Sequence, residues 1–298
     1  AGEDEKEDPL DFVLWKPKKE GEPAWSSPWS DGRPGWHIEC SVMSKKYLGE
    51  QIDIHAGGED LVFPHHENEI AQSEACNGKE FAKYWMHNAF LNIDNKKMSK
   101  SLGNFFTVRE ISEKYDLQVL RFFMLNAHYR SPLNFSAELM QSSKAGLDRI
   151  VTAADNLKHL AASAKDGGMT ESELAHYDAS EEFVKKFEEA MDDDFNTADA
   201  ISAIFELVKY LNTHAGADNS KEYLQKCLER LKTLCDILGL VIEKKEELLD
   251  ADVEALIAER QQARKEKNFA RADEIRAELL EKGIVLEDTR EGVKWKRS

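Results

Sequence analysis

The chain has 298 residues, of which 41% are hydrophobic, so it is long enough for two or three domains with cores of their own. No apolar run reaches the length of a membrane span, and the acidic start lacks the basic and apolar segments of a secretory signal. The net charge of -17, taken alone, argues against nucleic-acid binding, although it leaves room for local basic stripes. Four widely spaced cysteines predict a reduced cytoplasmic protein rather than a disulfide framework.

The first third of the chain has the pattern of an α/β unit. The expected elements, in chain order, are a helix over 38–48, a strand over 52–55, a helix over 64–76, a strand over 86–93 and a polar loop over 94–104. Two glycines, Gly57 and Gly58, follow the first strand and are typical of a tight turn. Strand, helix and strand at this spacing predict a βαβ unit, and hence a parallel sheet.

From residue 107 onward the pattern is almost entirely helical. Thr107 and Glu110 have the spacing of a capping box at the first helix of this part. Amphipathic helices are then expected over 117–127, 136–164, 180–192, 197–215 and 220–238. At the end of the chain we expect two charged helices, divided at Asn268, and a hairpin over 284–296. The predicted fold class is therefore α/β in the first part and mainly α after it.

Cys40, His65 and Glu69 are the candidates for a metal site. His65 and Glu69 are four residues apart, so a helix would place both side chains on one face. A thiolate, an imidazole and a carboxylate are all ligands of zinc. The same residues also fit a helix-face pair beside a small buried cysteine, and three ligands are one fewer than a closed site requires.

Lys97 and Lys100 lie in a polar segment that reads Lys-Met-Ser-Lys-Ser. Cations on such a loop can stabilise the negative charge that develops on a departing pyrophosphate. The alternative is an ordinary solvated loop. Together with the metal candidates, the pattern indicates a zinc site beside a loop that handles phosphate.

Three segments resemble, in order and spacing, the cysteinyl-tRNA synthetase family: GWHIECS at 35–41, DLVFPHHENE at 60–69 and KMSKS at 97–101. The last is the lysine signature loop of class I aminoacyl-tRNA synthetases. The resemblance covers essentially the whole chain and begins midway through the family's catalytic domain, so it implies that an N-terminal part is missing. It implies four regions: the C-terminal part of a Rossmann-like catalytic domain at 1–106, a connecting helical segment at 107–135, a helical-bundle anticodon domain at 136–245 and a small C-terminal RNA-binding module at 250–298.

The resemblance implies ATP-dependent ligation of cysteine to tRNA(Cys) through a cysteinyl-adenylate, with Mg²⁺ accompanying ATP. It implies that Cys40, His65 and Glu69 hold a zinc ion that grips the substrate thiolate, with a fourth ligand, a cysteine, in the missing part. Lys97 and Lys100 would be catalytic, and Lys100 would contact ATP. The isolated chain is therefore expected to be inactive, and no membrane partner is expected.

Further site residues follow from the same resemblance. Trp36 and His55 would line the cysteine pocket, and Gly57 and Gly58 the adenosine pocket. At the end of the chain, the tRNA-binding candidates are Trp295, Lys294, Lys296 and Arg297. Each has a structural alternative: a core position for Trp36, a structural histidine at 55, a turn at the glycines, and a small core closed by Trp295.

Two other functions remain open from the sequence. A paralogous ligase uses the same zinc and lysine motifs to join cysteine to an amino-sugar, but it lacks the anticodon-binding end that residues 190–298 resemble. The other alternative is a non-catalytic module that binds zinc and tRNA.

Overall fold

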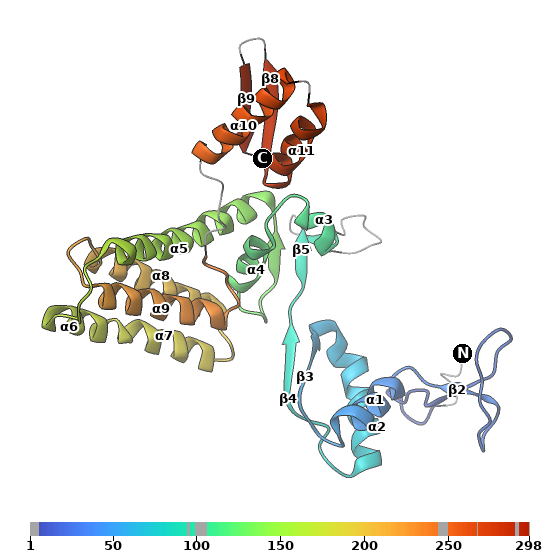
Figure 1. Cartoon of the computed structure of the whole chain (residues 1–298). Helices are drawn as coiled ribbons and strands as arrows, with labels where there is room; N and C mark the ends of the chain where they lie inside the picture. Colours follow the sequence, from blue (N-terminus) through green and yellow to red (C-terminus); the bar gives the residue numbers. More distant parts are fainter. Residues whose placement is uncertain are drawn as a thin grey trace. The chain divides into compact units, whose positions relative to one another are not determined.

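The computed structural model describes residues 6–93, 96–98, 106–243, 250–266, 268–289 and 292–297 (Figure 1). The chain divides into two compact units, Ala1–Val241 and Ile242–Ser298. None of the helices in the described ranges has the length and apolar character needed to cross a membrane.

A parallel pair of strands forms the centre of the α/β part. Strand β3 (Ile52–Gly58) pairs in parallel with β4 (Ala82–Asn88), and the connection between them contains η2 (Glu59–Leu61), η3 (Val62–His66) and α2 (Glu67–Asn77). The predicted βαβ unit is thus confirmed. Its small core is Ile52, Phe81 and Ala82, with Ile70 and Trp85 packed against them. The preceding α1 (Ile38–Leu48) contacts α2, and the hairpin of β1 (Trp15–Pro17) and β2 (Gly32–Pro34) comes before it.

Two sequence expectations in this part are wrong. The expected single strand over 86–93 is two strands, because the chain leaves β4 after Asn88 and β5 (Leu91–Ile93) joins a different sheet, between β6 (Lys96–Lys97) and β7 (Leu133–Phe135). A hydrogen bond from the Ala89 N–H to the Tyr129 carbonyl, 2.9 Å long, fixes this change of direction. The expected turn at Gly57 and Gly58 is also absent, because both residues continue β3 and pair with His87 and Asn88.

The helical part of the first unit follows the predicted order closely. The capping box of Thr107 and Glu110 opens α3 (Val108–Ser112), which is followed by α4 (Leu117–Leu125). The bundle then contains α5 (Ala137–Ser163), α6 (Glu171–Ala179), α7 (Glu181–Asp192), α8 (Thr197–His214) and α9 (Lys221–Ile237). Its buried apolar stripes meet in one core that includes Met140, Ile150, Ile204, Leu207, Leu211, Leu224 and Leu231.

The second unit is a helical hairpin packed on a β-hairpin. Helices α10 (Asp250–Lys265) and α11 (Phe269–Glu281) precede β8 (Ile284–Thr289) and β9 (Gly292–Arg297), which pair in antiparallel fashion. The Asn268 side chain accepts a hydrogen bond from the Arg271 N–H and so caps α11. Val253, Ile257, Ile275, Leu279, Ile284 and Leu286 form the core. The predicted pair of helices and the hairpin are confirmed.

Helix α6 was not anticipated, and a buried carboxylate explains how it is anchored. Glu173 is 5% exposed and accepts hydrogen bonds from the N–H groups of Thr170 (2.8 Å) and Ser220 (2.7 Å) and from the Asn219 amide (3.1 Å). Burial alone would raise the pKa of Glu173, but these hydrogen bonds stabilise the ionised form and lower the pKa to about 2. Glu173 thereby joins the start of α6 to the start of α9.

We predict that Glu173→Gln destabilises the protein by about 1–3 kcal/mol, because the neutral amide cannot satisfy the same donors. The measurement is urea unfolding followed by circular dichroism, with Glu171→Gln on the exposed face of the same turn as the control. Since the folded pKa lies below the ordinary value of 4.5, this stabilisation is complete above pH 4.5 and is lost as the pH falls toward about 2. If the variant and the unaltered protein lost the same free energy of unfolding between pH 4.5 and about pH 2, this role of Glu173 would be contradicted.

Candidate metal and amino-acid site

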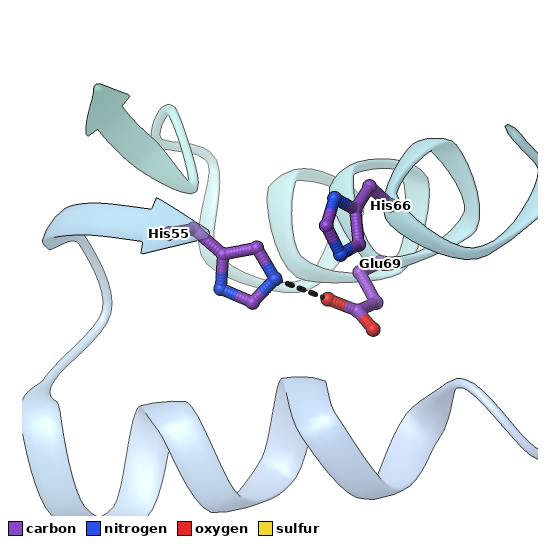
Figure 2. Close-up of side chains that lie close together, drawn as sticks. All are labelled: His55, His66 and Glu69. Atoms are coloured by element: carbon purple, nitrogen blue, oxygen red, sulfur yellow. Dashed lines mark ion pairs between the residues drawn. The ribbon is translucent and has the colours of Figure 1, made fainter. Parts of the chain in front are cut away.

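The predicted site residues of the α/β part gather at the carboxyl end of β3. Helix α1 carries Cys40, β3 carries His55, and the segment from η3 into α2 carries His65, His66 and Glu69. Figure 2 shows His55 projecting from the strand toward the helix that bears the other two side chains drawn. In open α/β sheets, ligands bind at this end of the strands because the connecting segments leave a crevice there.

Glu69 is the buried acid of the site. Its residue is 5% exposed, and the Oε2 atom lies 2.9 Å from Nε2 of His55 (Figure 2). This is ion-pair distance, yet the geometry gives Oε2 no hydrogen bond from the described residues. Burial acts to raise the pKa of Glu69, but the contacts with His55 and Cys40 outweigh it and hold the pKa below its usual value. The carboxylate is therefore ionised, with an oxygen left to accept a cation.

The Cys40 thiol is a second candidate donor near the same carboxylate. Partial burial, followed by the negative charge of Glu69, raises the pKa of Cys40 to about 11. At neutral pH the sulfur consequently keeps its proton. A soft cation at this position would replace that proton, as cysteine ligands lose theirs on binding metal.

His65 lies among aromatic rings of the segment just before α1. Its ring centre is 5.0 Å from the His37 ring and 5.7 Å from the Trp36 ring. Trp36 is 73% exposed, so it is no core residue within the described part of the chain. Of the predicted ligands, Cys40 and Glu69 influence each other's pKa, whereas His65 lies among these neighbouring aromatic rings.

His66 is a potential ligand that the sequence reasoning missed. Ligand atoms of His55, His66 and Glu69 lie within 4.8 Å of one another. His66 is 5% exposed, and its Nδ1 lies 2.8 Å from Nε2 of His87. Burial, followed by the charge of His55, lowers the pKa of His66, so the ring is neutral, as a metal ligand must be. The sequence does contain a signal for this ligand: His66 precedes Glu69 by three residues, a spacing that places both side chains on one face of a helix.

Gly57 is required by the His66 ring. A Cβ atom at position 57 would lie 2.8 Å from Cε1 of His66, closer than such atoms approach in proteins. At Gly58 a Cβ would meet only Oδ1 of the exposed Asp60, at 2.6 Å, and that side chain can move away. Gly57 alone thus keeps a bare backbone beside the histidine group.

The remaining predicted residues are only partly described. Lys97 ends β6, but its side chain and all of Lys100 lie outside the described residues. The side chains of Lys294, Lys296 and Arg297 lie outside them as well. Trp295 is described: it is partly buried and packs against the core of the second unit, opposite Leu286 in the hairpin.

Comparisons with known proteins agree with this architecture. Residues 1–145 match the class I (C) tRNA synthetase catalytic domain, 186–243 the DALR domain, and 246–295 the cysteinyl-tRNA ligase anticodon binding domain. A solved leucyl-tRNA synthetase complex of Agrobacterium radiobacter superposes with a TM-score of 0.58 at 15% identity, over 72% of this chain and 32% of that one, which shows the fold alone. The fold and this match identify residues 1–145 as belonging to the catalytic-domain family of class I aminoacyl-tRNA synthetases.

Three curated relatives specify the member of that class. Cysteine–tRNA ligases of Lachnospira eligens, Lachnoclostridium phytofermentans and Clostridioides difficile are 75%, 67% and 58% identical over 298, 300 and 294 residues. These alignments cover 100%, 99% and 99% of this chain and 63%, 64% and 63% of the relatives. The chain belongs to the cysteinyl-tRNA synthetase family, and it spans less than two thirds of the length of these relatives.

We predict that Cys40→Ser and Glu69→Gln lower zinc affinity by more than about 100-fold, beyond the 10–100-fold typical of losing an outer-shell partner. His65→Ala should lower zinc affinity as much. His66→Ala should lower it by only about 10–100-fold, as expected for a residue that supports a ligand without binding the ion. The measurement uses an extended protein, in which the N-terminal part of the Lachnospira eligens relative is fused to the start of this chain. Competition with a chromophoric chelator at pH 7 gives the affinity.

Cys76→Ser is the matched control, because Cys76 is a second exposed thiol that lies at the other end of α2. Should His66→Ala abolish zinc binding while His65→Ala leaves it intact, the ligand set would be His55, His66 and Glu69 instead.

Proposed function

We propose that this chain forms part of a cysteine–tRNA ligase, which couples cysteine to tRNA(Cys) at the expense of ATP through a cysteinyl-adenylate. The group of metal-ligating side chains around the buried Glu69 carboxylate, with ligand atoms of His55, His66 and Glu69 within 4.8 Å of one another, is the observation that carries the proposal. The catalytic-domain match and the names of the relatives support it.

Zinc fits the donor types present here, since Glu69 Oε2 is buried without a hydrogen bond from the described residues and ligand atoms of the His55 and His66 imidazoles lie within 4.8 Å of the Glu69 carboxylate. Cys40, His65 and Glu69 would hold the ion, with a fourth ligand from outside this chain. When bound, zinc supplies a soft Lewis acid that prefers a thiolate to a hydroxyl, which would reject serine at the first step.

The surrounding side chains of this chain orient and shield the amino acid. His55 holds the Glu69 carboxylate in place from 2.9 Å. Trp36, whose ring is largely exposed, offers an apolar wall next to His65 where a small substrate side chain can exclude water.

The adenosine would lie near Gly57 and Gly58, at the carboxyl end of β3, where ligands of open α/β sheets bind. Lys97 and Lys100 would neutralise the charge that develops as pyrophosphate departs from the Mg²⁺-bound ATP. The helical bundle and the C-terminal unit would bind tRNA(Cys), with contacts from Trp295, Lys294, Lys296 and Arg297. The match of residues 246–295 to an anticodon binding domain favours this function over an amino-sugar ligase.

We predict that Cys40→Ala and His65→Ala in the extended protein reduce cysteine-dependent exchange of pyrophosphate into ATP by more than about 100-fold, since each removes a donor to the ion. Cys76→Ala should exchange normally. The extended protein should show exchange and this chain alone should not; exchange by the extended protein separates the ligase from a module that binds zinc and tRNA without catalysis. Exchange that survives complete removal of metal would sink the zinc-dependent part of the proposal.

A second prediction concerns Lys100. Lys100→Ala should lower the turnover of exchange by about 100–1000-fold with little change in the KM for cysteine, because its charge acts on the transition state. Lys96→Ala, four residues earlier, serves as the control. An effect confined to the KM for cysteine would exclude this role.

A further inference from the structure

The turn between α7 and α8 carries backbone strain. Asp194 and Phe195 both have a φ of 56°, in the left-handed region that residues other than glycine rarely adopt, and they are alone in this among the described non-glycine residues. Left-handed backbone with a Cβ atom costs free energy, so the neighbouring interactions must offset it. The residues that the turn binds therefore indicate why the strain is kept.

The Asp194 carboxylate joins this turn to the segment that precedes β7. Its Oδ1 accepts a hydrogen bond of 2.7 Å from the Tyr129 hydroxyl, and its Oδ2 pairs with Nε of Arg130 at 2.8 Å. Nε2 of His128 lies 3.8 Å from Oδ2, and the Arg130 Nε–H also donates to the Tyr129 hydroxyl at 3.0 Å. One carboxylate thus holds three consecutive side chains from a distant part of the chain.

Stability alone does not explain this strained turn. The side chains of Asp194 and Arg130 are 40% and 60% exposed, and an ion pair of such exposure contributes little to folding. Phe195, the second strained residue, is 50% exposed, so the turn does not serve to bury its ring. What the turn achieves is the placement of a carboxylate, and strain of this kind persists where geometry matters for function.

The segment held by Asp194 supports the strand that carries Lys97. The Tyr129 carbonyl accepts a hydrogen bond of 2.9 Å from the N–H of Ala89, just before β5. Strand β5 then pairs on one side with β7 and on the other with β6, which ends at Lys97. A continuous series of hydrogen bonds therefore connects the Asp194 carboxylate with the backbone of Lys97.

This series crosses from one family match to the other. Tyr129 and Arg130 lie within residues 1–145, which match the class I catalytic domain, whereas Asp194 lies within residues 186–243, which match the DALR domain. A residue of the helical bundle thus supports the sheet of the catalytic-domain match to which the proposed phosphate-handling lysine belongs.

We propose that Asp194 is a positioning residue for adenylate formation. By holding residues 128–130 it keeps β5 and β6 in place, and so fixes the backbone from which Lys97 would act on the departing pyrophosphate. Asp194 acts through Tyr129 and Arg130 and has no chemical role of its own. The role of Lys97 rests on the proposed function, whereas the placement of β6 by Asp194 does not.

The first test is hydrogen–deuterium exchange with mass spectrometry on this full chain. Asp194→Asn is the variant, because asparagine tolerates left-handed backbone while it removes the charge that Arg130 pairs with. The amides of residues 89–93 and 96–98 should lose protection, while those of α5 and α9 keep theirs. Asp192→Asn removes the same charge at the exposed end of α7 and should change neither region.

Tyr129→Phe removes only the hydroxyl that Asp194 binds and should give the same pattern, so it replaces Asp194→Asn if that variant does not fold. Unchanged protection of residues 89–93 and 96–98 would overturn the inference. Equal loss of protection in α5 and α9 would also overturn it, because Asp194 would then only stabilise the bundle.

The second test is pyrophosphate exchange by the extended protein. Asp194→Asn should lower the turnover about 10-fold or more and leave the KM for cysteine unchanged, because a small displacement of a reacting group costs rate. When Lys97→Ala is already present, the further loss should be smaller, since both changes act on one group. Losses that multiply in full would contradict the inference. If the unaltered extended protein shows no pyrophosphate exchange, the proposed function fails, and the protection of β6 still decides whether Asp194 places that strand.

Discussion

The ion pair between the buried Glu69 carboxylate and His55 is the interaction on which the α/β part depends. A carboxylate that is 5% exposed would be costly without polar partners, so the chain must bring them to it. His55 comes from β3 and Glu69 from α2, so this pair, 2.9 Å long, joins the strand to the helix, and Cys40 of α1 is near enough to Glu69 for each to shift the pKa of the other. Stability and the proposed metal binding would place the same demand on this fold, because the residues that compensate Glu69 are of types that bind metals.

The change of sheet after β4 extends this arrangement toward the helical part. The backbone contact of Ala89 with Tyr129 turns the chain out of the first sheet, and β5 then pairs with β7, which directly precedes α5. Tyr129 in turn donates a hydrogen bond to Asp194, 2.7 Å long, in the turn between α7 and α8. The end of β4 and the bundle are thus joined through a short chain of hydrogen bonds, which provides a physical connection between them.

Sequence patterns correctly predicted the elements that depend on residues close together in the chain. They failed where contacts between distant residues determine the structure. The helices, the capping box at Thr107 and the final hairpin follow from local periodicity and caps. The division of 86–93 into two strands depends on Tyr129, some forty residues away in the chain, which no local pattern encodes. Likewise His66 was overlooked beside His65, because the irregular turn of η3 before α2 decides which of two adjacent histidines faces Glu69.

Burial and net charge act on different scales in this chain. Glu69 and His66 are buried and therefore held rigidly, which suits a site that must keep a few ligand atoms in fixed positions. Attracting a polyanion would require only that some cations stay uncompensated, because phosphate contacts act over a Debye length of about 8–10 Å. Ion pairs such as Lys144 with Asp148 cancel charge in place on the surface of the bundle. The net charge of -17 therefore says little about the field at any one surface of the chain.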